Sequence, residues 1–268
     1  MTENETTAKI AADLRRLGIQ FGDLILVHSS LSALGVVPGV AETVVRGLLQ
    51  AIGKSGTLLM PALSYEQKPH HLHNTRLTPS NVGAIPEHFR LREGTLRSVH
   101  PTHSVCGVGP AAAELLREHI KDHTPCGPHS PFNRMIAWGA KIVMLGCGLL
   151  PNTTMHALEE YIVPPYLFGE DCFYTITDGD GVTFTKTYTT HNFRGWKQRY
   201  DRVAELPDTR FLHRGMVLNA VTYIMDANGL KNAVLQKMRE DCLFFGLNSP
   251  GDGTRRLGIR PRSIVNCP

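Results

Sequence analysis

The apolar segment Leu24–Val27, which runs directly into His28 and Ser29, constrains the fold more than any other part of the sequence. Uninterrupted apolar runs of this length are typical of strands that are covered on both faces of a parallel or mixed sheet. A second such segment spans residues 57–60, and residues 40–52 between the two have helical apolar spacing. This strand–helix–strand unit predicts an α/β fold in which helices flank a mixed sheet.

The rest of the chain continues this alternation without a linker or an internal repeat, so we expect one domain over residues 1–268. Residues 62–81 have little periodicity and predict a long loop of the kind that often borders a site. A hairpin is expected over 173–190, and the tail 247–268 is expected to be irregular. Further helices are predicted over 7–17, 83–92, 110–119 and 230–242, and a further strand over 141–145.

Composition excludes several classes of protein. The net charge of +4 is spread along 268 residues without a block of like charges, which argues against a nucleic-acid partner. No apolar stretch is long enough to cross a bilayer. The N-terminus has no signal-peptide pattern, and the six cysteines have no CxxC pair, so we expect reduced thiols in a cytoplasmic protein. The sequence leaves open whether the chain forms a homo-oligomer.

The segment 151–160 carries the strongest local signal for chemistry. Asn152 or Thr153 can cap a helix, and His156 and Glu159 then fall on one face of its first turns. A carboxylate beside an imidazole orients it and raises its basicity, which a general base requires. Taken alone, the same spacing is also typical of an ordinary surface helix.

Two other polar segments could contact a ligand. Ser29 and Ser30 follow the buried strand, at the end of a sheet where α/β proteins place ligands. Residues 96–105 combine a guanidinium, two imidazoles and two serine hydroxyls, a composition that suits phosphate and amide groups. Each segment by itself is also compatible with a simple turn or polar loop.

Seven segments taken in order resemble the aminoglycoside 3-N-acetyltransferase family. They comprise residues 27–31, 56–61, 78–83, 97–104, 127–131, 145–146 and 152–159. The resemblance is clearest over 8–168 and continues more faintly to about residue 246. It implies a mixed α/β fold distinct from that of the GNAT superfamily, and direct transfer of an acetyl group from acetyl-CoA, as co-substrate, to an amine without a metal.

The resemblance also implies roles for individual residues. His156 corresponds to the family's general base, and Glu159 lies beside it. The residues implied to contact the coenzyme are Ser29, Ser30, Leu31, Arg97, Ser98, His100, Ser104 and Val105.

The acceptor segment departs from the family's pattern. Resistance enzymes of the family place carboxylates in a Tyr-x-Glu-x-Asp-like stretch after the hairpin, whereas residues 188–193 of this chain contain none. Glu66, Asp201 or Glu205 could supply negative charge instead, but the basic balance of the chain offers no general field for a polycation. We therefore expect a small amine bearing a carboxylate or phosphonate, near His191, Arg194 and the loop 70–73. The expected acceptor contacts are Glu66, Thr190, His191 and Asn192.

Other functions remain open on the sequence alone. A metallohydrolase could use neighbouring imidazoles, and a non-catalytic coenzyme-binding protein could keep the fold. A transferase that uses a longer acyl chain cannot be distinguished from an acetyl enzyme. A ping-pong route would need an activated nucleophile, for which Cys106 and Cys147 are the nearest candidates. The imidazoles considered for a metal are His70, His71, His73, His100 and His103.

Overall fold

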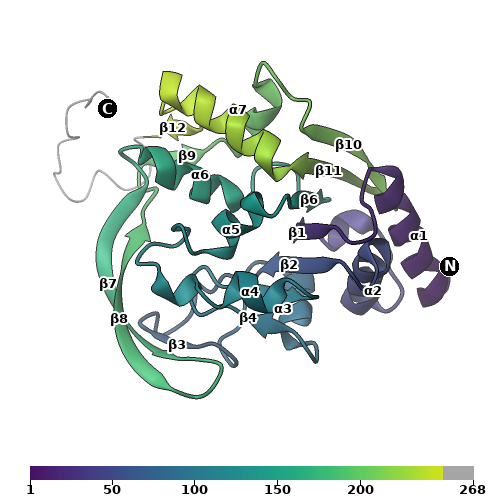
Figure 1. Cartoon of the computed structure of the whole chain (residues 1–268), viewed down its shortest axis with the longest axis horizontal. Coiled ribbons are helices and arrows are strands. Elements are labelled where there is room, and N and C mark those ends of the chain that lie inside the picture. The colour runs from purple at the N-terminus through teal and green to yellow at the C-terminus, as the bar shows by residue number, and fades with distance from the viewer. Residues whose placement is uncertain (250–268) are drawn as a thin grey trace.

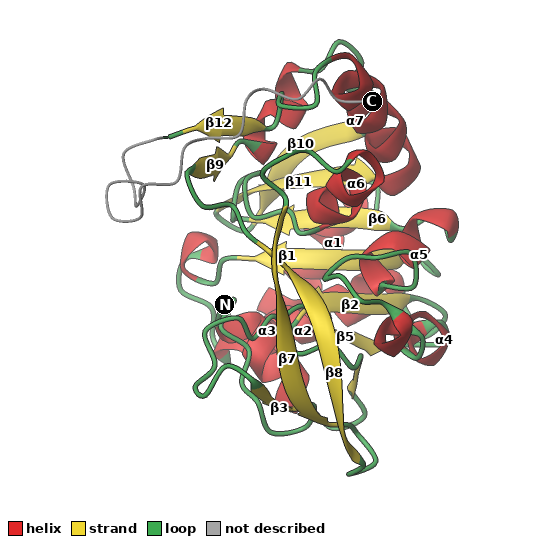
Figure 2. Cartoon of the chain, turned by 90° about the vertical axis from the view of Figure 1, so that its left-hand side faces the viewer, coloured by secondary structure: helices red, strands yellow, loops and turns green. Residues whose placement is uncertain are grey.

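A seven-stranded mixed sheet forms the centre of the protein, whose structure, a computed structural model, describes residues 1–249. Its strands lie in the order β10-β11-β6-β1-β2-β5-β4, which Figure 2 shows from β10 to β5. The three central strands β6, β1 and β2 are parallel, and antiparallel strands flank them on both sides. The predicted mixed sheet is thus confirmed. The strands are β1 (Leu24–Ser29), β2 (Thr57–Pro61), β4 (Leu96–Arg97), β5 (Val105–Val108), β6 (Lys141–Leu145), β10 (Leu212–Val217) and β11 (Ala220–Asp226).

Helices cover both faces of this sheet, which explains the uninterrupted apolar run of β1. Ile25 and Val27 pack against one layer of helices, while Leu24 and Leu26 pack against the other. The first layer contains α1 (Glu3–Arg16), α2 (Val40–Ile52) and α3 (Ala84–Leu91). The second contains α4 (Ala112–Leu116), α5 (Pro131–Ala137), α6 (Thr154–Ile162) and α7 (Ala227–Glu240).

The helix termini differ from the predictions where local capping or packing decides them. Helix α1 begins at Glu3 rather than near residue 7, because Thr2 and Glu5 form a reciprocal capping box. The helix expected over 110–119 is divided into α4 and a short 3-10 helix, η2 (His119–Lys121). Helix α2 has the predicted limits.

Several strands were not predicted from the sequence, among them β4 and β5 of the central sheet. The hairpin β10–β11 turns at Leu218, whose positive φ of 50° is unusual for a residue with a Cβ. The loop 62–81 contains β3 (Leu72–Asn74), which pairs with β7. Residues expected in the irregular tail form β12 (Gly246–Asn248), paired with β9 (Trp196–Gln198). The rest of that predicted tail, from residue 250, lies outside the described residues.

A long hairpin lies beside the sheet and reaches its ligand-binding end. Strands β7 (Phe168–Thr177) and β8 (Thr183–His191) are antiparallel and form a separate three-stranded sheet with β3. Figure 1 shows that β1 and β2 point toward the side of the molecule along which this hairpin runs. His191, the last residue of β8, is thereby placed near the carboxyl ends of the central strands.

The state of the cysteines agrees only in part with the prediction. Cys106, Cys126, Cys147 and Cys172 are free thiols, but Cys242 is disulfide-bonded, so the prediction of six reduced cysteines is wrong for that residue. Among residues 1–249, no helix has the length and apolar character needed to cross a membrane.

Candidate active site

A cavity of about 560 Å³ opens at the carboxyl ends of the three central parallel strands. Ser29 is the last residue of β1, Leu63 follows β2, and Cys147 follows β6, and all three contribute to the wall. Loops after parallel strands are where α/β sheets bind ligands. The N-terminal part of α6 and the end of β8 close the other sides with His156 and His191.

Inside this cavity, His156 and Glu159 are joined by a residue that the sequence analysis did not identify. The Tyr200 hydroxyl lies 2.8 Å from His156 Nδ1 and donates to Glu159 Oε2 over 2.5 Å. A direct approach of His156 Nδ1 to Glu159 Oε2 measures 3.5 Å. Tyr166 donates to the other carboxylate oxygen of Glu159 over 2.7 Å. The predicted pairing of His156 with Glu159 is therefore present, and Tyr200 strengthens it.

The donors and acceptors of this network determine which ring nitrogen of His156 carries the proton. Burial and the neighbouring Glu159 raise the pKa of Tyr200 far above its usual value, so its hydroxyl keeps its proton. That single proton is donated to the buried Glu159, and the Tyr200 oxygen must therefore accept from His156 Nδ1–H. The lone pair is left on Nε2. His156 is consequently arranged to accept a proton from a molecule in the cavity.

His191 is held by a second carboxylate. Its Nε2 lies 2.9 Å from Glu160 Oε1, while its Nδ1 is buried without a hydrogen-bond partner. Burial, together with nearby His156, holds the pKa of His191 well below its usual value, so the ring is neutral at neutral pH. Arg194 is exposed. In this state His191 offers no positive charge to the anionic amine that we expected near it.

The predicted coenzyme contacts after β1 are partly in the cavity. Ser29 lines it, and its hydroxyl has no partner within the protein. Ser30 Oγ lies 3.2 Å from Ser32 Oγ at the start of the 3-10 helix η1 (Ser32–Leu34), and Leu31 caps that helix. His28 also lines the wall. This turn thus has free polar groups for a ligand.

Arg97, in contrast, has no donor left for a coenzyme phosphate. Its five N–H groups reach five acceptors of the protein: the carbonyl oxygens of Ala62, Thr75 and Thr78 and the hydroxyls of Ser64 and Ser104. Burial lowers the pKa of the guanidinium to about 10, and it still carries its charge at neutral pH. In the described structure the side chain therefore ties the loop 62–78 to β4 and to the turn before β5, and its contact with the coenzyme stays a prediction.

The other residues of this motif are also absent from the cavity wall. Ser98 accepts from Val105 N–H and contacts His119 Nδ1 over 2.9 Å, and Ser104 donates to the Ala62 carbonyl. His100 Nδ1 accepts from the main chain of Thr102 and His103. Ser98, His100, Ser104 and Val105 are all buried. They form the turn that places His103 in the cavity, and the coenzyme contacts expected of them stay a prediction.

The four residues expected to contact the acceptor do not all line the cavity. Only His191 of the four lines it; Glu66 and Asn192 are exposed, and Thr190 donates to the Glu170 carbonyl. Asp201 pairs with Arg199, and Glu205 with Arg202. Among the described residues, the wall contains no Asp, Glu, Lys or Arg side chain. The cavity is therefore lined by neutral groups.

A cysteine nucleophile and the predicted metal cluster are both disfavoured. Burial raises the pKa of Cys106 and of Cys147 to about 12, and neither is a thiolate at neutral pH. The five histidines considered for a metallohydrolase do not assemble, since His70 and His71 are exposed on the loop. His103 instead approaches His156 and His191.

Buried histidines predict that the protein loses stability in mild acid. Burial lowers the pKa of His28, His73 and His119 to about 3, against about 6.5 when unfolded. The contribution of these rings to the free energy of unfolding is complete above pH ~6.5. It is lost as the pH falls below that value, because the unfolded chain then binds more protons than the folded protein does. Each ring should lower the free energy of unfolding by up to about 1.4 kcal/mol per pH unit.

Urea unfolding at about pH 7.5 and about pH 5.5 measures this dependence. His119→Gln should reduce the slope of stability against pH, whereas His70→Gln on the exposed loop should leave it unchanged. Equal stability at the two pH values would contradict the neutral state of these buried rings.

Comparisons with known proteins agree with this architecture. The family model for aminoglycoside 3-N-acetyltransferases matches residues 26–239. Aminoglycoside N(3)-acetyltransferase IX of Micromonospora chalcea is 35% identical over 173 residues, which are 58% of this chain and 61% of that protein. Aminoglycoside N(3)-acetyltransferase VII of Streptomyces paromomycinus is 34% identical over 58% of this chain and 60% of that protein. The chain thus spans about three fifths of the length of these relatives.

Solved structures of similar fold cover more of the chain. The structure of AAC-IIIb with CoASH has a TM-score of 0.77 at 24% identity and covers 93% of this chain and 99% of its own. The structure of AAC-VIa bound to sisomicin has a TM-score of 0.71 at 25% identity and covers 90% and 98%, respectively. The predicted fold, a mixed sheet with flanking helices unlike that of the GNAT superfamily, is confirmed by these similarities.

Proposed function

The chain belongs to the aminoglycoside 3-N-acetyltransferase family, and from this premise we propose that it transfers an acetyl group from acetyl-CoA directly to an amine of a small molecule. The observation that carries this proposal is the hydrogen-bond chain from His156 through Tyr200 to Glu159 at the wall of the cavity. It leaves Nε2 of His156 open to the cavity, where an acceptor amine can enter.

The proposed reaction has one chemical step on the carbonyl. The acceptor nitrogen forms a bond to the acetyl carbon while His156 Nε2 removes a proton from that nitrogen. The carbon–sulfur bond then breaks, and the leaving thiolate takes the proton from the His156 imidazolium, which gives the coenzyme thiol and restores the base. The imidazolium formed on His156 donates through Nδ1 to Tyr200, whose contact with Glu159 stabilises the positive charge.

We assign the coenzyme to the turn after β1. Ser29 presents a hydroxyl without a partner, and Ser30 and Leu31 stand at the start of η1 beside it. The N-terminal turn of α6 borders the same cavity at Thr153, and helix dipoles favour negative charge at such a position. Acetyl-CoA therefore serves as the proposed co-substrate, in agreement with the CoASH-bound relative of the same fold.

The proposed acceptor carries few charges besides the reacting amine. A polycation would lose hydration in a cavity whose described wall offers no carboxylate. An anionic amine would find no Lys or Arg on that wall, and His191 is neutral. Phe193, Tyr65 and Leu63 supply apolar surface instead. A small, mostly neutral amine fits this environment better than a polycation or an anionic amine does.

Thiol release from acetyl-CoA tests the proposal, with protein pretreated with a chelator. The acceptor panel contains a gentamicin-like aminoglycoside, uncharged small monoamines, and amines bearing a carboxylate or phosphonate. We expect acceptor-dependent release, with the highest kcat/KM for a monoamine. Higher kcat/KM for the aminoglycoside would refute the acceptor class, and acceptor-independent release or none with any amine would refute the proposed function.

A further inference from the structure

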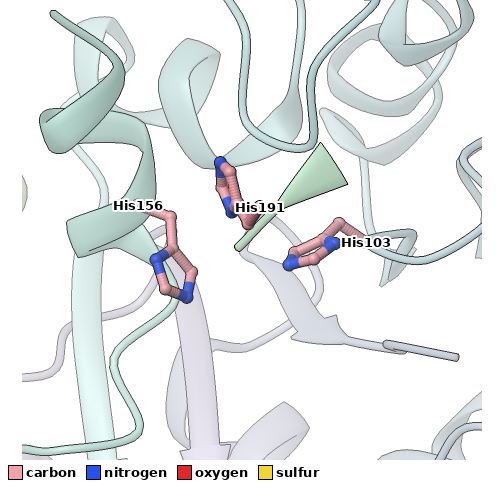
Figure 3. Close-up of side chains that lie close together, drawn as sticks. All are labelled: His103, His156 and His191. Carbon is pink, nitrogen blue, oxygen red and sulfur yellow. The ribbon is translucent and has the colours of Figure 1, made fainter. Parts of the chain in front are cut away.

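Three imidazoles from distant parts of the chain meet at the cavity wall. His103 comes from the turn before β5, His156 from α6 and His191 from the end of β8. One ring nitrogen of each lies within 4.8 Å of the corresponding nitrogens of the other two. Figure 3 shows the three rings converging on one region. The proposed acetyl transfer uses only His156.

In each ring, the nitrogen away from this region has a partner that fixes the ring. His191 Nε2 contacts Glu160 Oε1, His156 Nδ1 contacts the Tyr200 hydroxyl, and His103 Nδ1 lies 2.9 Å from Thr102 Oγ1. The remaining nitrogens are Nδ1 of His191, which is buried and has no partner, and Nε2 of His156 and of His103. An imidazole bound through one nitrogen to a carboxylate or hydroxyl is the usual arrangement of a metal ligand.

The charge beside the cluster agrees with this arrangement. The Glu160 carboxylate adds negative charge behind His191.

We propose that His103, His156 and His191 bind a divalent transition metal ion of the zinc class, and that the ion reversibly inhibits acetyl transfer. Three imidazoles with a fourth position open to a cavity are a known coordination of Zn²⁺. The ion would occupy the Nε2 lone pair of His156, and that nitrogen could then accept no proton. The inhibitory part of this inference rests on the proposed function, whereas the binding part does not.

Binding requires a small contraction of the cluster. Zn–N bonds of about 2.0–2.1 Å in a tetrahedral site place ligand nitrogens about 3.3 Å apart. One ring nitrogen of each histidine lies within 4.8 Å of the other two, and these nitrogen–nitrogen distances must therefore shorten. Rotation of His156, which is 12% exposed at the cavity wall, can supply much of this movement because its ring is the least buried of the three.

Cobalt titration tests the site without any measure of activity. Chelator-treated protein without a polyhistidine tag is titrated with Co²⁺, and the visible absorption of four-coordinate cobalt is recorded. We expect one equivalent to bind. His191→Gln should weaken binding by about 100-fold or more, and Glu160→Gln, which keeps all three ligands, by about 10–100-fold. The double variant His70→Gln/His71→Gln on the exposed loop is the matched control and should bind as the wild type does.

Zinc inhibition tests the consequence. One equivalent of Zn²⁺ should suppress thiol release by the wild-type protein at least about tenfold, and a chelator should restore it. X-ray absorption of the zinc-loaded wild type should show three imidazole nitrogens, a result that does not depend on whether a variant folds.

Three results would overturn the inference: no cobalt band in the wild type, a band that persists in His191→Gln, or a band lost in the loop control. Full activity of the zinc-saturated protein would overturn the inhibitory role. Cobalt binding as predicted in a protein without acetyl transfer to any amine would instead refute the proposed function and leave the metal site standing.

Discussion

Replacement of His156 by alanine is expected to lower the turnover of acetyl transfer by about 10²- to 10⁴-fold, the usual contribution of a positioned general base. His156 Nε2 carries the only lone pair that the Tyr200–Glu159 chain directs into the cavity. Coenzyme affinity should change little, because none of the proposed coenzyme contacts involves the His156 side chain. Steady-state kinetics with acetyl-CoA and an active amine, with coenzyme binding measured calorimetrically, separate the two effects.

Tyr200→Phe provides the matched comparison. This variant keeps the aromatic ring and the His156 imidazole but removes the hydroxyl that fixes the tautomer. We expect a smaller loss of turnover than in His156→Ala, together with an altered pH profile, because Nδ1 would no longer be held as the donor. Unchanged turnover in His156→Ala would remove His156 from its role, and an unchanged pH profile in Tyr200→Phe would contradict the assigned tautomer.

Replacement of Arg97 by alanine is expected to lower the free energy of unfolding by at least about 3 kcal/mol. The change removes five donors. The Ala62 carbonyl and the hydroxyls of Ser64 and Ser104 keep other hydrogen bonds, but the Thr75 and Thr78 carbonyls lose their donor, and each unsatisfied buried group costs about 1–3 kcal/mol before water compensates. The KM for acetyl-CoA should not rise selectively, because no Arg97 donor is free. Urea unfolding and coenzyme kinetics measure the two quantities.

Two further variants keep this prediction testable even if Arg97→Ala does not fold. Arg97→Lys retains the charge but offers three donors to five acceptors, and we expect an intermediate loss of stability. Arg194→Ala, at an exposed position, is the control and should be near neutral. A stable Arg97→Lys protein with a strongly raised KM for acetyl-CoA would restore Arg97 to the coenzyme site and contradict its structural role.

The sequence was most informative where one short segment decides the structure. The apolar run at β1 predicted a strand buried on both faces, and the spacing of His156 and Glu159 predicted their contact. Both predictions depend only on the spacing of residues within one strand or one helix. The hairpin β10–β11 was not predicted, because its turn places Leu218 at a positive φ. Glycine or asparagine is usual at such a position and would have indicated a turn in the sequence.

Features that depend on distant segments could not be predicted in the same way. Tyr200 is 44 residues from His156, and nothing around it marks it as a partner of Glu159. The hydrogen bonds of Arg97 within the protein could not be predicted either, because composition shows how many donors a motif contains but not which of them the protein itself uses. The convergence of His103 with His191 likewise requires the hairpin β7–β8 to reach the end of the sheet.

The most direct test of direct transfer with His156 as base is a single-turnover reaction of chelator-treated protein with acetyl-CoA that carries an isotopically labelled acetyl group. Mass spectrometry of the quenched mixture locates the label on the acceptor, the protein or the coenzyme. The proposed mechanism predicts label on the acceptor amine, none on the protein at any time, and a slowed transfer in His156→Ala. Label on Cys147 or another side chain before it reaches the acceptor, or label that stays on the coenzyme with every amine, would contradict that mechanism.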